Sequence, residues 1–403
     1  MDFAPSQRAQ EYAERVRAFI ESEIAPVEED HLRGLLAAPP DERWRTYPVI
    51  EELKAKAREA GLWNLFLPEV SGLSNVEYAP LAELMGRSFV AAEVFNCNAP
   101  DSGNMEVLQH FGSAEQKERW LEPLLAGEIR SAFCMTEPGV ASSDATTMEA
   151  TAVVEGDEVV LDGRKWFSTG IGHPRCEVLL FMGLTDPAAD RYRQHSIVAV
   201  PKDTPGVEVE RMLPVMGRYD EPSGHGEVSF TGVRLPVTAI VGAPGQGFEI
   251  GQSRLGPGRV HHCMRLIGLA EVALEAACRR GVDRTAFRKP LVNLGGNRER
   301  IADARIAINQ ARLLVLHTAW LLDTQGILGA LSQVSQIKVA VPLMTQNVVD
   351  MAMQLHGGAG LTDDFPLSAA WTVARALRLA DGPDEVHRGV VARLELTKYG
   401  MSR

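Results

Sequence analysis

The amino-acid sequence predicts an α+β protein in which two helical regions flank a middle β-domain. Apolar residues recur at helical spacing in the first part of the chain and again in the last part. The middle part instead contains short alternating segments separated by Gly, Pro and Asp. We therefore expect a helical N-terminal domain at 1–130, a β-barrel or β-sandwich at 131–242 and a helical bundle at 243–403.

The helices predicted in the N-terminal domain are amphipathic. Residues 8–24 carry apolar side chains at intervals of three or four, residues 49–60 repeat this pattern, and residues 114–125 form a third candidate. Gly61 and Gly127 follow the second and third candidates, where glycine is a typical helix stop.

The middle domain is predicted from a series of short strands. Residues 151–161 form two strand candidates around a turn that contains Gly156. Four further candidates lie at 178–182, 196–200, 206–209 and 227–230. Their number and spacing favour a small barrel or sandwich.

The C-terminal domain is predicted from two long amphipathic helices. Apolar residues recur every three or four positions in residues 301–322, which is typical of a helix in a bundle. A second helix is expected at 333–355, and Gly357-Gly358 is its expected end.

Composition and charge exclude several classes of function. The 403 residues are 45% hydrophobic and carry a net charge of −12, which argues against a dedicated nucleic-acid binder. The five cysteines are scattered without a C-x-x-C pair, which is typical of reduced thiols rather than disulfides or a metal site. The N-terminus lacks the features of a secretory signal, and no window reaches the roughly 18 apolar residues of a membrane span. We expect a cytoplasmic, bacterial protein without membrane, nucleic-acid or metal partners.

Residues 132–170 are the most informative stretch of the chain. They contain Thr136-Glu137-Pro138-Gly139, then Ser142-Ser143, and after a predicted hairpin the segment Lys165–Gly170. Taken alone, Pro-Gly is typical of a type II turn, and a strand Trp is more often a core residue. Together they place two polar turns, about thirty residues apart, at the ends of a strand pair. Such an arrangement can hold the edge of a flat heteroaromatic ring.

Three separated blocks resemble the acyl-CoA dehydrogenase family. They are Thr136–Gly139 with Ser142, Lys165-Trp166 and Gln354–Gly360. The resemblance implies an N-terminal α-domain, a middle β-domain and a C-terminal four-helix bundle. It also implies FAD at a subunit interface of a homotetramer, an acyl-CoA substrate and an electron-transfer flavoprotein as electron acceptor. Three further segments resemble the branch that also occurs fused to a kinase-like domain in larger eukaryotic proteins: residues 95–101, 254–262 and 380–385.

The resemblance assigns one set of cofactor contacts to the middle domain. These residues are Phe133, Met135, Thr136, Ser142, Ser143, Trp166 and Ser168. Backbone N–H groups and the Thr136 hydroxyl would meet the flavin edge, where reduced flavin carries negative charge. Ser142, or Ser143 one step away, would meet the pyrophosphate, and Ser142 also the substrate. The family usually has threonine where this chain has Ser168.

A second set of predicted cofactor contacts lies in the C-terminal domain and would reach the FAD of a neighbouring subunit or its own. It comprises Arg284, Phe287, Gln354, Gly357, Gly358, Pro383 and Glu385. A guanidinium such as that of Arg284 suits a pyrophosphate, although alone it is more often a solvated helix residue. A Gly-Gly after a helix is alone more often a simple C-cap. The segment after Pro290 departs from the family in lacking its usual His-Gln.

Asp381 aligns with the glutamate that serves as catalytic base in most of the family. Alone, its Asp-Gly sequence is more typical of a turn. A carboxylate is the group needed to remove the weakly acidic α-proton of a thioester. Aspartate is one methylene shorter, roughly 1.5 Å, and a misplacement of about 1 Å can cost on the order of 10²-fold in rate. Asp220 is a distant second candidate. The resemblance also places Arg259, His262 and Gly382 beside the substrate, whereas His261-His262 has poor spacing for a metal pair.

These observations predict FAD-dependent α,β-dehydrogenation of an acyl-CoA to a trans-2-enoyl-CoA, as in fatty-acid β-oxidation. Two alternatives remain open. The kinase-linked branch suggests acyl-CoAs with a 4-hydroxyl or 4-phosphate group, for which Arg218, Arg254, Arg259 and His262 would supply cations. The other alternative is a flavin-binding or DNA-associated family member without dehydrogenase chemistry. The acidic net charge and the carboxylate at position 381 argue against it.

Overall fold

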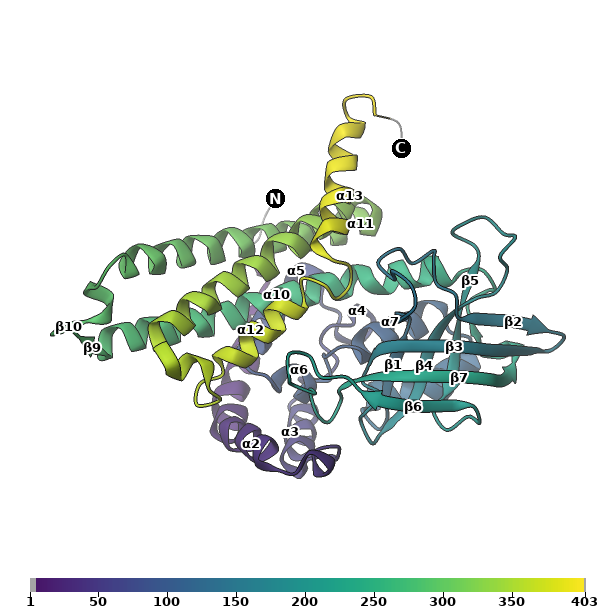
Figure 1. The fold of residues 1–403 in the computed structure, drawn as a ribbon, viewed down its shortest axis with the longest axis horizontal. Coiled ribbons are helices and arrows are strands. Elements are labelled where there is room, and N and C mark those ends of the chain that lie inside the picture. The colour runs from purple at the N-terminus through teal and green to yellow at the C-terminus, as the bar shows by residue number, and fades with distance from the viewer. Residues whose placement is uncertain (1–4, 402–403) are drawn as a thin grey trace. The chain divides into compact units, whose positions relative to one another are not determined.

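The structure is a computed structural model that describes residues 5–401 (Figure 1). The chain forms two compact units, neither of which is one continuous segment. Unit 1 contains the residues up to Pro26, Ser71–Ala92 and the chain from Arg259 onward. Unit 2 contains Val27–Val70 and Glu93–Gly258.

Unit 2 is built on an eight-stranded mixed sheet (Figure 1). The strand order is β6-β7-β3-β2-β4-β5-β8, and β1 pairs with β4 beside this path. The β1–β4 and β2–β4 pairs are parallel, whereas the other pairs are antiparallel. The strands are β1 (Arg130–Cys134), β2 (Thr151–Glu155), β3 (Glu158–Thr169), β4 (Cys176–Leu184), β5 (His195–Pro201), β6 (Val207–Met212), β7 (His225–Pro236) and β8 (Ile240–Val241).

The predicted hairpin forms where the sequence placed it. Gly156 adopts a φ of 68°, which the tight turn between β2 and β3 requires, and Glu155 pairs with Glu158 across it. Phe181 and Phe230 meet in the core of the sheet with ring centroids 4.5 Å apart. The apolar residues of the predicted strands therefore form one hydrophobic core.

Helices complete unit 2. Helix α7 (Asp101–Phe111), which contacts β1, follows the short α6 (Ala91–Val94). The other helical elements are α2 (Ala25–Ala37), η2 (Pro40–Glu42), α3 (Pro48–Glu59), α4 (Pro68–Ser71), α8 (Ala114–Gln116), η3 (Lys117–Leu121), α9 (Glu122–Ala126) and η4 (Val237–Ala239).

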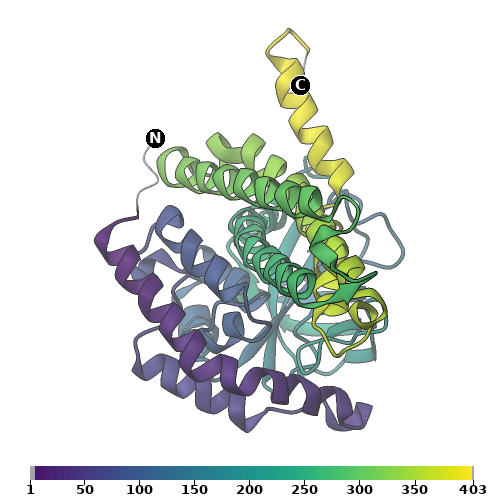
Figure 2. The same cartoon turned by 90° about the vertical axis from the view of Figure 1, so that its left-hand side faces the viewer.

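Unit 1 is helical. It comprises α1 (Gln7–Phe19), η1 (Ile20–Ile24), α5 (Asn75–Met85), most of α10 (Gly247–Asp283), β9 (Thr285–Ala286), β10 (Lys289–Pro290), η5 (Leu291–Asn293), α11 (Asn297–His356), η6 (Gly357–Leu361), α12 (Leu367–Ala376) and α13 (Asp384–Thr397). Gly326 breaks α11 into two arms with φ 67° and ψ −177°. The arms lie beside the C-terminal part of α10, as both views show (Figures 1 and 2).

The packing of α5 on α10 depends on two glycines. A Cβ at Gly86 would lie 1.9 Å from the carbonyl oxygen of Arg265, and a Cβ at Gly268 would lie 1.9 Å from that of Glu83. The two backbones are therefore in direct contact. The guanidinium of Arg312 binds Glu83 at 2.8 Å and ties α11 to α5.

The order of helices, strands and helices along the chain confirms the predicted α+β fold class. Within the described residues, one helix, Asn297–Leu361, is long and apolar enough to cross a membrane by length and composition. This finding differs from the expectation that no window is so apolar. Because 44% of its apolar window is buried in the structure, and core helices of soluble proteins meet the same criteria, it is weak evidence for a membrane span.

Candidate active site

The loop after β1 and the end of β3 lie side by side in unit 2. The backbone N–H of Trp166 donates to the carbonyl oxygen of Thr136 at 2.9 Å. The ammonium of Lys165 donates to the carbonyl oxygen of Met135 at 3.0 Å. The two polar segments that the sequence singled out, thirty residues apart, are thus adjacent in space.

Glu137 and Lys165 form a buried ion pair that joins these segments. The Lys165 Nζ lies 2.7 Å from Glu137 Oε1, and the two side chains are 0% and 6% exposed. The Glu137 carboxylate also accepts hydrogen bonds from the backbone N–H groups of Glu149 and Ala150, at 2.8 and 3.0 Å. Burial lowers the pKa of Lys165, and Glu137 opposes this shift. Both residues stand in the quoted motifs, but the sequence analysis gave neither a role.

The predicted pyrophosphate residues belong to the same loop. Ser142 Oγ accepts a hydrogen bond from the backbone N–H of Glu137 at 2.8 Å, which folds the loop back on itself. Ser143, the alternative residue, is exposed. The structure therefore gives Ser142 a role in shaping the loop and leaves Ser143 open to solvent.

A bulge in β3 presents Trp166 and Ser168. The pairing of β3 with β7 shifts register between Lys165 and Ser168, and Phe167 within the bulge has a φ of 50°. Among the described residues, the buried Trp166 Nε1 has no hydrogen-bond partner, and the buried Ser168 Oγ has no partner other than the weakly hydrogen-bonding thiol of Cys134. Because buried polar atoms are nearly always hydrogen-bonded, these two atoms fit a polar ligand such as the edge of a flavin ring.

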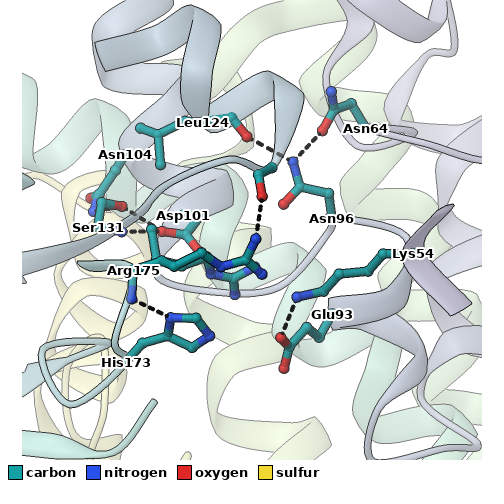
Figure 3. A network of polar contacts seen from close by, with 12 residues as sticks. Lys54, Asn64, Glu93, Asn96, Asp101, Asn104, Leu124, Ser131, His173 and Arg175 are labelled. Atoms are coloured by element: carbon teal, nitrogen blue, oxygen red, sulfur yellow. Dashed lines mark hydrogen bonds and ion pairs between the residues drawn. The ribbon is translucent and has the colours of Figure 1, made fainter. Parts of the chain in front are cut away.

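Strand β1, which carries Phe133, is fixed by a buried polar network (Figure 3). Asp101 Oδ1 accepts hydrogen bonds from the backbone N–H and the Oγ of Ser131, at 2.7 and 2.5 Å. Asp101 Oδ2 lies 2.8 Å from Arg130 Nε. Asn104 on α7 donates to Ser131 Oγ at 2.8 Å. These bonds tie the start of β1 to α7.

The network continues toward α3 (Figure 3). Lys54 Nζ lies 2.7 Å from Glu93 Oε1. Burial would raise the pKa of Glu93, but Lys54 and Arg130 outweigh burial and lower it to about 2. Burial, assisted by Arg130, lowers the pKa of His173 to about 3. Glu93 is thus a carboxylate and His173 a neutral ring at neutral pH.

A second polar cluster lies beside Phe133. The Arg254 guanidinium carbon stands 4.1 Å from the centre of the Phe133 ring, and Arg254 Nε donates to Asn104 Oδ1 at 3.0 Å. Glu106 is 7% exposed, and among the described residues its Oε2 has no hydrogen-bond partner. Burial raises the pKa of Glu106 to about 8 against the influence of Arg254. The cluster therefore holds a neutral acid, an amide and a guanidinium.

Asp381 lies in unit 1, in the turn between α12 and α13. Its φ is 56°, in the left-handed region, which Asp tolerates better than most residues. Arg259 Nε donates to the Asp381 carbonyl oxygen at 2.9 Å, and His387 Nε2 lies 3.2 Å from the same oxygen. Gly382 follows with a φ of 103°, and Lys338 Nζ donates to its carbonyl oxygen at 3.4 Å. The main chain of the predicted base is thus clamped from three helices.

The carboxylate of Asp381 points toward α10. Its Oδ2 lies 3.6 Å from His262 Nε2, and the two side chains are 20% and 22% exposed. The other ring nitrogen, Nδ1, lies 3.2 Å from Arg265 Nη2. Sequence analysis placed His262 near the substrate but missed its contact with Asp381, because the two residues are 119 positions apart.

The remaining predicted cofactor residues lie on the surface of unit 1. Phe287 sits at the tip of the β9–β10 hairpin, 89% exposed, and Arg284 precedes that hairpin and is also exposed. The C-terminal end of α11 presents the exposed residues Gln354, Gly357 and Gly358. Pro383 is the N-cap of α13, and the Glu385 side chain is 78% exposed. The predicted cofactor residues thus belong to two units, the first set to unit 2 and this second set to unit 1.

Family models match nearly the whole chain. The N-terminal, middle and C-terminal domains of acyl-CoA dehydrogenase match residues 6–128, 132–233 and 245–396. The chain belongs to the acyl-CoA dehydrogenase family. The prediction of this family of oxidoreductases, whose members depend on FAD, is thereby confirmed.

Individual relatives agree with the branch that the sequence suggested. Acyl-CoA dehydrogenase family member 11 of Mus musculus is 49% identical over 98% of this chain, but the match covers 51% of that protein. The chain thus spans about half the length of this larger relative. The probable acyl-CoA dehydrogenase FadE2 of Mycobacterium tuberculosis is 48% identical over 99% of this chain and 98% of its own. A solved acyl-CoA dehydrogenase family structure from Mycobacterium abscessus has 72% identity and a TM-score of 0.96, and covers 98% of this chain and 100% of its own.

Proposed function

We propose that this acyl-CoA dehydrogenase family member oxidises an acyl-CoA thioester to a trans-2-enoyl-CoA. The observation that carries the proposal is the placement of Asp381: two contacts to its carbonyl oxygen fix the main chain of the turn, and its carboxylate lies beside His262. Asp381 would accept the α-proton and become a carboxylic acid, while the β-hydrogen departs as a hydride. FAD, when bound, supplies the acceptor for that hydride.

The residues of the β1–β3 region fit the cofactor. Trp166 Nε1, which is buried and unpartnered among the described residues, and Ser168 Oγ, which has beside it only the weak hydrogen-bonding thiol of Cys134, suit the polar edge of a ring. The loop that contains Thr136 is bound to β3 through the ion pair of Lys165 with Glu137 and the hydrogen bond of Lys165 to the carbonyl oxygen of Met135. Its backbone N–H groups are therefore held in place before a ligand binds. Preorganised donors of this kind stabilise developing negative charge without further reorganisation.

The exposed cofactor residues of unit 1 support an oligomer. A side chain as large and apolar as Phe287, 89% exposed at a hairpin tip, suits burial against another subunit. We propose that Arg284, Phe287, Gln354, Gly357 and Gly358 reach the FAD of a neighbouring subunit in a homotetramer. We further propose an electron-transfer flavoprotein as electron acceptor, a role in β-oxidation and a cytoplasmic location, each on the strength of family membership.

A second candidate substrate is an acyl-CoA with a 4-hydroxyl or 4-phosphate group. The polar cluster of Arg254, Asn104 and Glu106 beside Phe133 favours it, because a pocket for a plain hydrocarbon has no need of these groups. Glu106 is neutral at pH 7 and would not repel a phosphate. Arg218, also named from the sequence, lies instead in the turn that bridges to Val215.

Anaerobic flavin reduction tests the proposed function. The purified protein is mixed with short, medium, long, branched, 4-hydroxy and 4-phospho acyl-CoAs, and flavin absorbance is followed beside an Asp381→Asn variant. We expect the wild type to bleach and the variant to bleach at least about 10³-fold more slowly, because an amide cannot accept the proton.

The outcome also separates the candidates. Faster bleaching by 4-substituted than by plain acyl-CoAs would establish the second substrate class, and the reverse order would dismiss it. A protein that binds FAD and bleaches with none of these substrates would refute dehydrogenase chemistry. The flavin-binding, non-dehydrogenase alternative would then be the better account.

A further inference from the structure

We propose that His262 is a positioning residue for Asp381: its Nε2–H donates to the Asp381 carboxylate and fixes the orientation in which this short base meets the substrate. The inference rests on the proposed function, since it concerns the same proton-removing carboxylate. Nothing in the family resemblance assigns this role to a histidine. It follows from two distances and the hydrogen-bonding chemistry of three side chains.

The first distance is the 3.6 Å between His262 Nε2 and Asp381 Oδ2. It exceeds a normal N–H···O hydrogen bond by a few tenths of an ångström. Catalytic hydrogen bonds are often this long before substrate binds and shorten in the complex. Both side chains are about one-fifth exposed, so the contact is only partly screened by water.

The second distance identifies which ring nitrogen carries the proton. Arg265 Nη2 lies 3.2 Å from His262 Nδ1. A guanidinium has only donors, so Nδ1 must be the acceptor, and the proton of the neutral ring is therefore on Nε2. This tautomer directs an N–H at Asp381. It also excludes a proton relay, because a protonated Nε2 cannot accept the proton that Asp381 has taken from the substrate.

The contact with His262 reaches the carboxylate itself. Arg259 and His387 bind the Asp381 carbonyl oxygen and fix the backbone. Aspartate reaches one methylene less far than the glutamate usual in the family, so it has little tolerance for a wrong rotamer. A misplacement of about 1 Å costs on the order of 10²-fold in rate.

Other titratable and charged groups of the described chain also face Asp381. They come from α10, α11 and α13 and include Arg259, Cys263, Lys338 and His387, and burial lowers the pKa of Lys338. Burial lowers the pKa of His387 to about 4 and raises that of Cys263 to about 12. Neither changes its charge between pH 5.5 and 9. Because a donated hydrogen bond favours the carboxylate, loss of His262 should raise the pKa of Asp381.

The first test compares His262→Leu, which removes the donor, with His262→Gln, whose amide N–H reaches a similar position. Rate constants for anaerobic flavin reduction and substrate dissociation constants are measured from pH 5.5 to 9. We expect His262→Leu to reduce the rate constant by about 10- to 100-fold, with substrate affinity changed by less than about threefold. Its pH midpoint should rise by about one unit, whereas His262→Gln should restore the rate to within about fivefold of wild type.

His110→Leu is the matched control. His110 Nε2 also approaches a carboxylate, at 3.9 Å from Glu69 Oε1, but both residues belong to unit 2, whereas Asp381 belongs to unit 1. Its reduction rate should stay within about twofold of wild type, in line with a surface charge pair. The inference is overturned if His262→Leu keeps the wild-type rate and midpoint, or if His262→Gln is as slow as His262→Leu.

The second test does not depend on turnover. The ring nitrogens of ¹⁵N-histidine-labelled protein are observed by NMR, and the His262 signals are those that disappear in His262→Gln. We expect the proton of the His262 ring on Nε2, and we expect the chemical shift of that nitrogen to change in Asp381→Asn. A proton on Nδ1, or an unchanged chemical shift, overturns the inference. If none of the acyl-CoA substrates reduces the flavin of the wild type, the proposed function fails. The NMR measurement still decides whether His262 donates to Asp381.

Discussion

Replacing Glu106 with glutamine is expected to stabilise the protein by an amount that grows as the pH rises. Glu106 is buried in α7, where burial raises its pKa to about 8, with Glu69 adding to the shift and Arg254 opposing it. Glutamine has nearly the same shape and does not titrate. The substitution therefore isolates the folding stability that is lost because this carboxyl stays protonated in the folded protein but ionises in the unfolded chain.

The sign follows from the two pKa values. The unfolded chain releases the Glu106 proton near pH 4.5, whereas the folded protein retains it up to about pH 8. In this window the unfolded state binds fewer protons, so the folding stability of the wild type falls as the pH rises. At about 1.4 kcal/mol per pKa unit, the loss between pH 5 and pH 7.5 amounts to about 3 kcal/mol. Glu106→Gln lacks this loss.

Thermal midpoints of wild type and variant, measured at constant ionic strength and saturating FAD from pH 5 to pH 8.5, test the prediction. For a chain of this size one kcal/mol corresponds to about 1–2 °C, so the gap between the midpoints should widen by about 3–6 °C between pH 5 and pH 7.5. The exposed Glu115, replaced by glutamine, is the control and should show a constant gap. A gap for Glu106→Gln that does not change with pH would refute the reasoning.

Three further substitutions have definite expectations. Lys165→Met leaves the Glu137 carboxylate buried and unpaired, so the free energy of unfolding should fall by about 3–5 kcal/mol, and the FAD-to-protein ratio, read from absorbance, should fall with it. His173→Asn removes a histidine whose pKa is about 3 in the folded protein. As the pH drops from 6.5 toward 3, the unfolded wild type binds a proton that the folded protein does not, so its free energy of unfolding should fall by about 1.4 kcal/mol per pH unit. The variant lacks this loss, so its thermal midpoint should fall less steeply over the same range. Gly382→Ala strains a φ of 103° and brings a Cβ within 2.9 Å of His387 Nε2, so flavin reduction should slow by at least about tenfold while the midpoint falls by no more than the equivalent of about 1–3 kcal/mol. An unchanged reduction rate in Gly382→Ala would contradict the account of the clamped turn.

Local patterns made most of the fold predictable. The hairpin of β2 and β3 was predictable because alternation and Gly156 act over a few residues, and the structure has its turn at that glycine. The two helices of the C-terminal region were likewise predictable from their separate apolar repeats. Their joining as one α11 with a break at Gly326 was not, because that glycine sits in a segment without a strong stop signal.

The site was harder to predict because its contacts are between residues far apart in the chain. Lys165 forms its buried ion pair with Glu137, which lies 28 positions away in the chain. No local sequence feature in either segment predicts this pair. The bulge at Phe167 shifts the register of β3, and a one-residue shift reverses which face each side chain occupies. Alternation alone therefore could not place Trp166 and Ser168. Their assignment to the flavin came from family resemblance and stays a prediction.

The glycine contact between α5 and α10 links the N-terminal part of the chain to the position of His262. Gly86 rests on the backbone of Arg265, whose guanidinium holds the ring of His262. A single methyl group at position 86 would have to displace α10 by more than an ångström, and the histidine would move with the helix. The absence of a side chain at position 86, nearly three hundred positions before Asp381, is thus one of the conditions that place His262 beside that aspartate.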